Sequence, residues 1–84
     1  MKTLHLVYFA RLREAFARSS ETLSTDAATG AELVAELAGR GGAWADELGG
    51  ARVFRLAINQ DMARLDDVLP DGAEVALFPP VTGG

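Results

Sequence analysis

The sequence contains no cysteine. This absence excludes disulfide bonds, zinc ribbons, iron–sulfur clusters and thiol catalysis. His5 is the only histidine, and no spacing signal supplies the partners that a metal site or a serine–histidine pair would need. No nucleophile and base can be paired from the remaining residues, so we expect a protein without an active site of its own.

Basic residues and long apolar runs are also scarce. Eight lysines and arginines face twelve aspartates and glutamates, which gives a formal net charge of −4. Nucleic acids and anionic membranes attract basic surfaces, so we expect neither as a partner. No apolar segment approaches the about 20 residues of a membrane-spanning helix. Arg11, Arg13 and Glu14 interrupt the apolar run behind Lys2, which indicates a structured segment and a cytoplasmic protein, not a signal peptide.

The residues that are present are typical of one small globular domain. The 84 residues are 49% hydrophobic and 24% charged, an ordinary composition for a folded chain. Segments rich in β-branched, aromatic and aliphatic residues predict strands at 3–9, 20–24, 53–59, 62–65 and 74–78. Apolar residues at helical spacing predict short helices at 10–17 and 43–48.

The main helix is predicted between a capping box, Thr29 to Glu32, and a glycine stop at Gly39. The order of elements predicts an α+β fold, in which one mixed sheet packs against this helix and the short helices are additions. The first and last strands are the most apolar, so we expect them side by side at the centre of the sheet.

Three motifs that could suggest a ligand site have simpler structural interpretations. The segment 39–42 (GRGG) follows a helix and lacks the Gly-Lys-Ser/Thr ending of a phosphate loop, so it indicates a helix stop. Trp44 is expected to pack over the sheet edge. The acidic residues of the C-terminal third do not match a calcium loop, which favours solvated turns or a surface for a basic partner. They are Asp61, Asp66, Asp67, Asp71 and Glu74.

The C-terminal tail is the main candidate for function. Pro79 and Pro80 cannot extend a strand ladder, so we divide the chain into a domain at 1–78 and an extended tail at 79–84. Six residues reach about 20 Å at about 3.3 Å each. Gly83 and Gly84 have no Cβ, so a narrow channel of another protein can admit them. The terminal carboxylate could be activated by adenylation, and as a thiocarboxylate it could carry sulfur without any thiol.

Three segments resemble the small subunit of molybdopterin synthase, also called molybdopterin-converting factor subunit 1. They are 8–14 (YFARLRE), 57–60 (AINQ) and 71–84 (DGAEVALFPPVTGG), and the resemblance covers essentially the whole chain. The ending 78–84 is the most specific part, whereas Gly83-Gly84 alone occurs in all ubiquitin-like modifiers and sulfur carriers. One departure is visible, because members often carry a glycine after the first helix where this chain has Arg18-Ser19-Ser20.

This resemblance implies a β-grasp, ubiquitin-like fold and a sulfur carrier in molybdenum cofactor biosynthesis. Gly84 would be adenylated by a ubiquitin-activating-like adenylyltransferase that uses ATP, and then converted to a thiocarboxylate with sulfur from a donor protein. The tail would insert into the large subunit of a heterotetrameric synthase and donate sulfur for the molybdopterin dithiolene. The chain itself would bind no cofactor. The implied partner-binding residues are Phe78, Pro79, Pro80, Val81, Thr82, Gly83 and Gly84.

Two other functions and one structural question stay open at this point. The chain could be a sulfur carrier for thiamine or tRNA thiolation, or a protein modifier that conjugates to lysines. Phe78 shares a strand face with Glu74 and Ala76, which would make it an exposed anchor for a partner near the sheet margin. The alternative is that Phe78 packs in the core.

Overall fold

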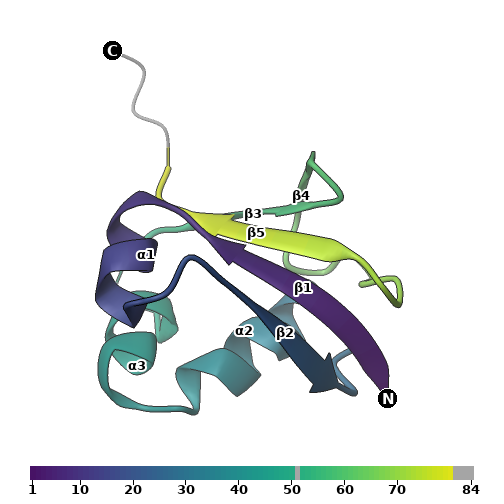
Figure 1. Ribbon diagram of the computed structural model, residues 1–84, viewed down its shortest axis with the longest axis horizontal. Coiled ribbons are helices and arrows are strands. Elements are labelled where there is room, and N and C mark those ends of the chain that lie inside the picture. The colour runs from purple at the N-terminus through teal and green to yellow at the C-terminus, as the bar shows by residue number, and fades with distance from the viewer. Residues whose placement is uncertain (51, 81–84) are drawn as a thin grey trace.

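Strands β1 (Lys2–Tyr8) and β5 (Glu74–Phe78) lie side by side and run parallel to each other (Figure 1). The computed structural model describes residues 1–50 and 52–80. The strand order is β2-β1-β5-β3-β4, and every pair except β1–β5 is antiparallel. The other strands are β2 (Ser20–Thr25), β3 (Arg55–Ile58) and β4 (Asp61–Ala63). The first and last strands are therefore neighbours inside the sheet, which confirms that prediction.

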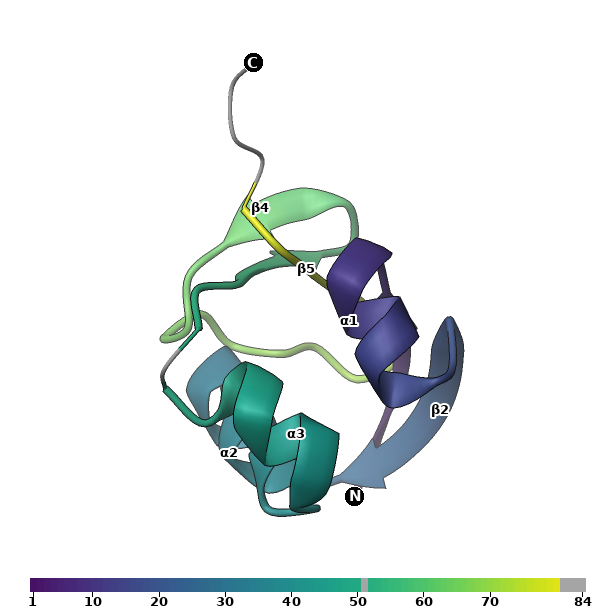
Figure 2. The ribbon, with the colours of Figure 1, turned by 90° about the vertical axis from the view of Figure 1, so that its left-hand side faces the viewer.

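The helices are α1 (Ala10–Phe16), α2 (Gly30–Ala38) and α3 (Gly42–Leu48). In Figure 2, α2 and α3 lie together on one side of the strands. The core between helices and sheet contains fully buried side chains from β1, β5, α1 and α2, namely Leu4, Leu6, Tyr8, Leu12, Leu33, Leu37, Val75 and Leu77. No helix in the described ranges is long and apolar enough to cross a bilayer.

The hairpin between β3 and β4 explains where the strand bounds differ from the prediction. Asn59 and Gln60 form a two-residue turn with left-handed φ values of 50° and 71°, so that Ile58 pairs directly with Asp61. β4 therefore begins one residue earlier than predicted. β3 begins only at Arg55, which pairs with Phe78, because the residue after Phe78 is a proline with no N–H to extend the ladder.

The start of α2 confirms the predicted cap and adds a close contact. The Thr29 hydroxyl accepts a hydrogen bond from the Glu32 N–H at 3.3 Å. The Glu32 carboxylate accepts from the N–H of Ala28, not from that of Thr29 as in the standard capping box. A Cβ on Gly30 would lie 3.2 Å from the Leu65 carbonyl oxygen. A side chain at this position would have to displace the segment after β4, which packs closely on the start of the helix.

Helix α1 ends at Ala17, which adopts a left-handed conformation with φ 55° and ψ 34°. Glycine usually fills this position, because a Cβ in that region costs about 1–2 kcal/mol. The departure at Arg18-Ser19-Ser20 thus follows directly after an alanine in the left-handed region.

An aromatic cluster joins α1, α3 and the sheet. Trp44 stacks on Phe16 with ring centroids 3.8 Å apart, and the Arg40 guanidinium lies 4.4 Å from the Trp44 ring centroid. Arg40 also donates two hydrogen bonds of 2.9 Å to Glu21, and the Tyr8 hydroxyl donates one of 2.6 Å to the same carboxylate. These bonds lower the pKa of Glu21, while burial and the Glu21 carboxylate raise the pKa of Tyr8. Trp44 therefore has a structural role, packed between Phe16 of α1 and the Arg40 side chain.

Candidate functional site: the open face of the sheet and the base of the tail

The face of the sheet opposite the helix-covered side contains a groove of about 880 Å³. Its lining is mainly apolar and comes from four strands or strand ends. The main apolar side chains are those of Val7, Phe9, Ala57, Met62, Ala76, Phe78, Pro79 and Pro80. Ala10, Gln60 and Glu74 complete the lining, and we call all eleven residues the open-face groove.

Strand register explains why this part of the sheet is hollow. Ala76 on β5 is paired with Val7 on one side and with Ala57 on the other, and Ala57 is in turn paired with Met62. Two alanines therefore form the floor in the middle of the row. The aromatic ring of Phe78, two residues along β5 on the same face, forms part of the wall.

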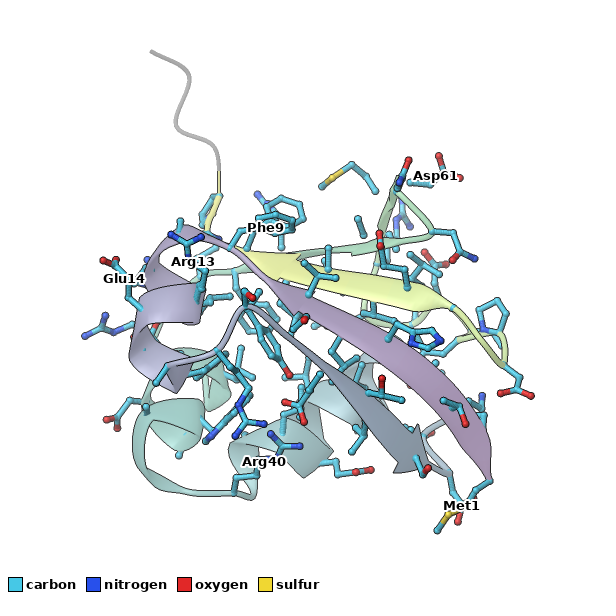
Figure 3. The ribbon with its side chains drawn as sticks, in the orientation of Figure 1. Met1, Phe9, Arg13, Glu14, Arg40 and Asp61 are labelled. Atoms are coloured by element: carbon cyan, nitrogen blue, oxygen red, sulfur yellow. The ribbon has the colours of Figure 1, made fainter. Side chains whose placement is uncertain are left out.

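Large apolar side chains of the groove are exposed to solvent. Phe9 is 49% exposed and Met62 is 66% exposed, and Phe9 lies at the end of the sheet from which the chain leaves β5 (Figure 3). Contiguous exposed apolar surface of this kind marks sites of protein interaction. The geometry offers a docking surface, and it brings no nucleophile–base pair into the groove.

The described part of the predicted tail site belongs to this groove. Phe78 is half-buried and lies outside the buried core cluster, on the open face. Phe78 is the last residue of the central strand β5, so it lies at the end of the sheet where the chain leaves it, and not on a lateral edge strand. Pro79 and Pro80 line the groove beside it.

The remaining predicted site residues are Val81, Thr82, Gly83 and Gly84, and they lie outside the described residues. Their roles stay predictions from the sequence.

Sequence reasoning missed Phe9, Val7 and Met62 as parts of the site. The signal for the first two was available, because Val7 and Phe9 alternate with the buried Leu6 and Tyr8 along the first strand. No sequence signal places Met62 in the same row, since that depends on the register of two separate strand pairs.

The other candidate residues lie elsewhere or have structural contacts. His5 is exposed on β1, opposite Glu74 on β5. The exposed acids Asp66 and Asp67 lie in the turn after β4, and the Asp71 carboxylate accepts a hydrogen bond from the Thr3 N–H at 2.8 Å. Within residues 1–50 and 52–80, no cluster of three or more histidine, aspartate or glutamate side chains could hold a metal ion.

Comparison with known proteins adds independent information on this arrangement. A family model described as the ThiS family matches residues 6–84. The molybdopterin synthase sulfur carrier subunit of Haemophilus influenzae is 37% identical over 81 residues, which cover 96% of this chain and 99% of that protein.

Solved structures agree with the sequence matches. The small archaeal modifier protein 1 of H. volcanii has a TM-score of 0.78 at 25% identity, with 96% of this chain and 100% of that chain covered. A complex of subunits 1 and 2 of molybdopterin-converting factor from Helicobacter pylori contains a chain with a TM-score of 0.68 at 25% identity, with 98% and 99% covered. These likenesses confirm the predicted α+β fold of the ubiquitin-like β-grasp type.

Proposed function

The chain belongs to the ThiS family, and from this premise we propose that it is the sulfur carrier subunit of a molybdopterin synthase. Relatives that carry this name align over nearly the full chain. The observation that carries the proposal is the position of the open-face groove, which Pro79 and Pro80 line at the base of the tail. A partner that docks on the groove would therefore receive the tail at the edge of its own binding surface.

The proposed chemistry takes place at the C-terminus in two steps. The Gly84 carboxylate attacks the α-phosphorus of ATP on an adenylyltransferase, and pyrophosphate leaves. Sulfide-level sulfur from a donor protein then attacks the acyl carbon of the adenylate. The bond from this carbon to the AMP oxygen breaks, AMP leaves, and a thiocarboxylate remains on Gly84. The chain binds no cofactor in this scheme, because ATP is used by the activating enzyme.

The large subunit is the proposed acceptor of the loaded tail. A related chain occurs in a complex of subunits 1 and 2 of molybdopterin-converting factor, which supports a partner of this kind. We propose that the groove docks on the large subunit and that Val81 to Gly84 enter its active site as an extended segment. Backbone hydrogen bonds would hold such a segment with little demand on side chains. We also propose that the protein acts in the cytoplasm.

Mass spectrometry tests this function. The protein is incubated with a cognate adenylyltransferase, ATP and a sulfur donor, and it should gain the mass of one sulfur minus one oxygen. Fragmentation should place the gain on Gly84. A gain on any internal residue, or no gain with an adenylyltransferase that is active on its own carrier, would contradict the proposal.

A protein modifier is the second candidate, because the chain resembles the small archaeal modifier protein 1 of H. volcanii over its whole length. Recovery of the chain in isopeptide linkage to lysines of other proteins would favour this function. Sulfur transfer to molybdopterin without such conjugates would favour the first.

A further inference from the structure

Among residues 1–50 and 52–80, Glu74 is the only ionisable side chain that lines the open-face groove. It is half-buried, at the first position of the central strand β5, and its face is shared with Ala76 and Phe78. Its backbone N–H donates to the Asn59 side chain at 3.0 Å. Within the described part of the chain, no hydrogen bond or ion pair is made by the Glu74 carboxylate itself.

Two carboxylates on the helix-covered side of the protein, in contrast, form ion pairs with arginines. Glu21 pairs with Arg40 and Arg18, and the buried Glu47 pairs with Arg11 and Arg52. On that side the fold itself supplies arginine partners for these carboxylates, whereas the Glu74 carboxylate in the groove is left to solvent.

Neither the arginine of the neighbouring strand β3 nor the histidine of β1 on the same face pairs with the Glu74 carboxylate in the described part of the chain. Arg55 is paired across the sheet with Phe78, four residues further along β5. At about 3.3 Å per residue, that separation along the strand is about 13 Å. His5 lies opposite Glu74 on β1, with no hydrogen bond between the two side chains in residues 1–50 and 52–80.

Docking on the groove would therefore remove water from an unpaired carboxylate. A carboxylate that loses its water without gaining a partner is strongly destabilised. A purely apolar partner surface would incur this penalty, whereas a surface with a suitably placed cation would avoid it.

We propose that Glu74 is a specificity-determining residue, and that the groove accepts a protein surface that is apolar around one lysine or arginine. This inference rests on the proposed function, because it names the chemistry of the partner that docks beside the tail. The cation of the partner pairs with the Glu74 carboxylate as the apolar side chains close over Ala57 and Ala76.

The test measures the dissociation constant for the cognate large subunit of molybdopterin synthase by titration calorimetry. Glu74→Gln keeps the shape of the side chain and removes the charge, and it should raise the dissociation constant at least about tenfold. Glu74→Lys should raise it further. The matched control is Asp66→Asn, which removes the same charge from an exposed turn outside the groove and should change the constant less than twofold. Thermal unfolding of each variant confirms that it is folded.

One further variant separates the role of Glu74 from the docking surface on which the proposed function relies. Ala76→Arg places a large cation on the groove floor and should abolish binding if the groove is the docking surface. If Ala76→Arg abolishes binding and Glu74→Gln binds like the wild type, the docking surface stands and the role of Glu74 is wrong. If Ala76→Arg binds normally, the docking surface itself is wrong and the role of Glu74 is lost with it.

Salt dependence separates a buried ion pair from long-range steering. The loss caused by Glu74→Gln should persist at high salt, because a desolvated pair is screened much less than an exposed one. A loss that disappears at high salt would show that Glu74 acts only by steering, which would overturn the inference.

Discussion

Replacing Phe78 by alanine should weaken binding to the large subunit and leave the fold nearly intact. Replacing its neighbour Leu77 by alanine should destabilise the fold and leave the binding of the folded protein nearly unchanged. The two residues are consecutive on β5 and face opposite sides of the sheet. Leu77 is fully buried in the core, whereas Phe78 is half-buried and lines the open-face groove. The two variants therefore compare the loss of a core side chain with the loss of a groove side chain at adjacent positions of the same strand.

The expected magnitudes differ accordingly. Leu77→Ala should lower the free energy of unfolding by about 2–5 kcal/mol, as for other buried leucines. Phe78→Ala should lower it by less, because the ring lies outside the core cluster. Truncating an aromatic anchor at the centre of an interface costs about 2 kcal/mol or more of binding free energy, which is about a thirtyfold rise in the dissociation constant.

Urea unfolding and binding titrations on the same preparations provide the assay. Titrations should be performed at a temperature at which both variants are folded, so that binding is not lost through unfolding. A Phe78→Ala protein that is destabilised by about 3–5 kcal/mol yet binds normally when folded would place Phe78 in the core and remove it from the docking surface.

Three further predictions concern the end of α1, the half-buried Glu21 carboxylate and the tail. Ala17→Gly should raise the free energy of unfolding by about 1 kcal/mol, because it removes the Cβ from a left-handed residue; urea titration checks this, and an unchanged midpoint would contradict it. The depressed pKa of Glu21 should contribute stability that is fully present above its unfolded value of 4.5 and is lost as the pH falls through the lower folded value. Glu21→Gln should therefore flatten the acid limb of a stability–pH profile, and a profile as steep as that of the wild type would show that other carboxylates dominate. Gly83→Val should block sulfur transfer by its bulk and leave docking detectable, and a normal transfer rate would mean that the acceptor channel is wide.

Much of the fold could be predicted because its signals are local. The period of apolar residues changes from strand-like to helix-like after Phe9, and the cap at Thr29 is a short motif. The bounds of β5 and the side-by-side position of β1 and β5 are confirmed. A strand that is apolar on both faces can be placed inside the sheet from its own sequence, before its neighbours are known.

The groove could not be predicted in the same way, because it depends on contacts between distant segments. Val7, Ala76, Ala57 and Met62 form one row only through three separate strand registers. A shift of one residue in any of them would move a side chain to the other face. The left-handed conformation of Ala17 could not be predicted either, because alanine carries no sequence signal for that conformation.

Reconstitution of the synthase would show whether Gly84 carries the sulfur that reaches molybdopterin. The thiocarboxylated protein is mixed with the large subunit and cyclic pyranopterin monophosphate, and both molybdopterin formation and the mass of the carrier are followed. We expect molybdopterin to accumulate while the carrier returns to the mass of the free carboxylate, and we expect a chain lacking Gly84 to support neither change. Molybdopterin formed while the carrier keeps its sulfur, or formed equally well with the truncated chain, would contradict this expectation.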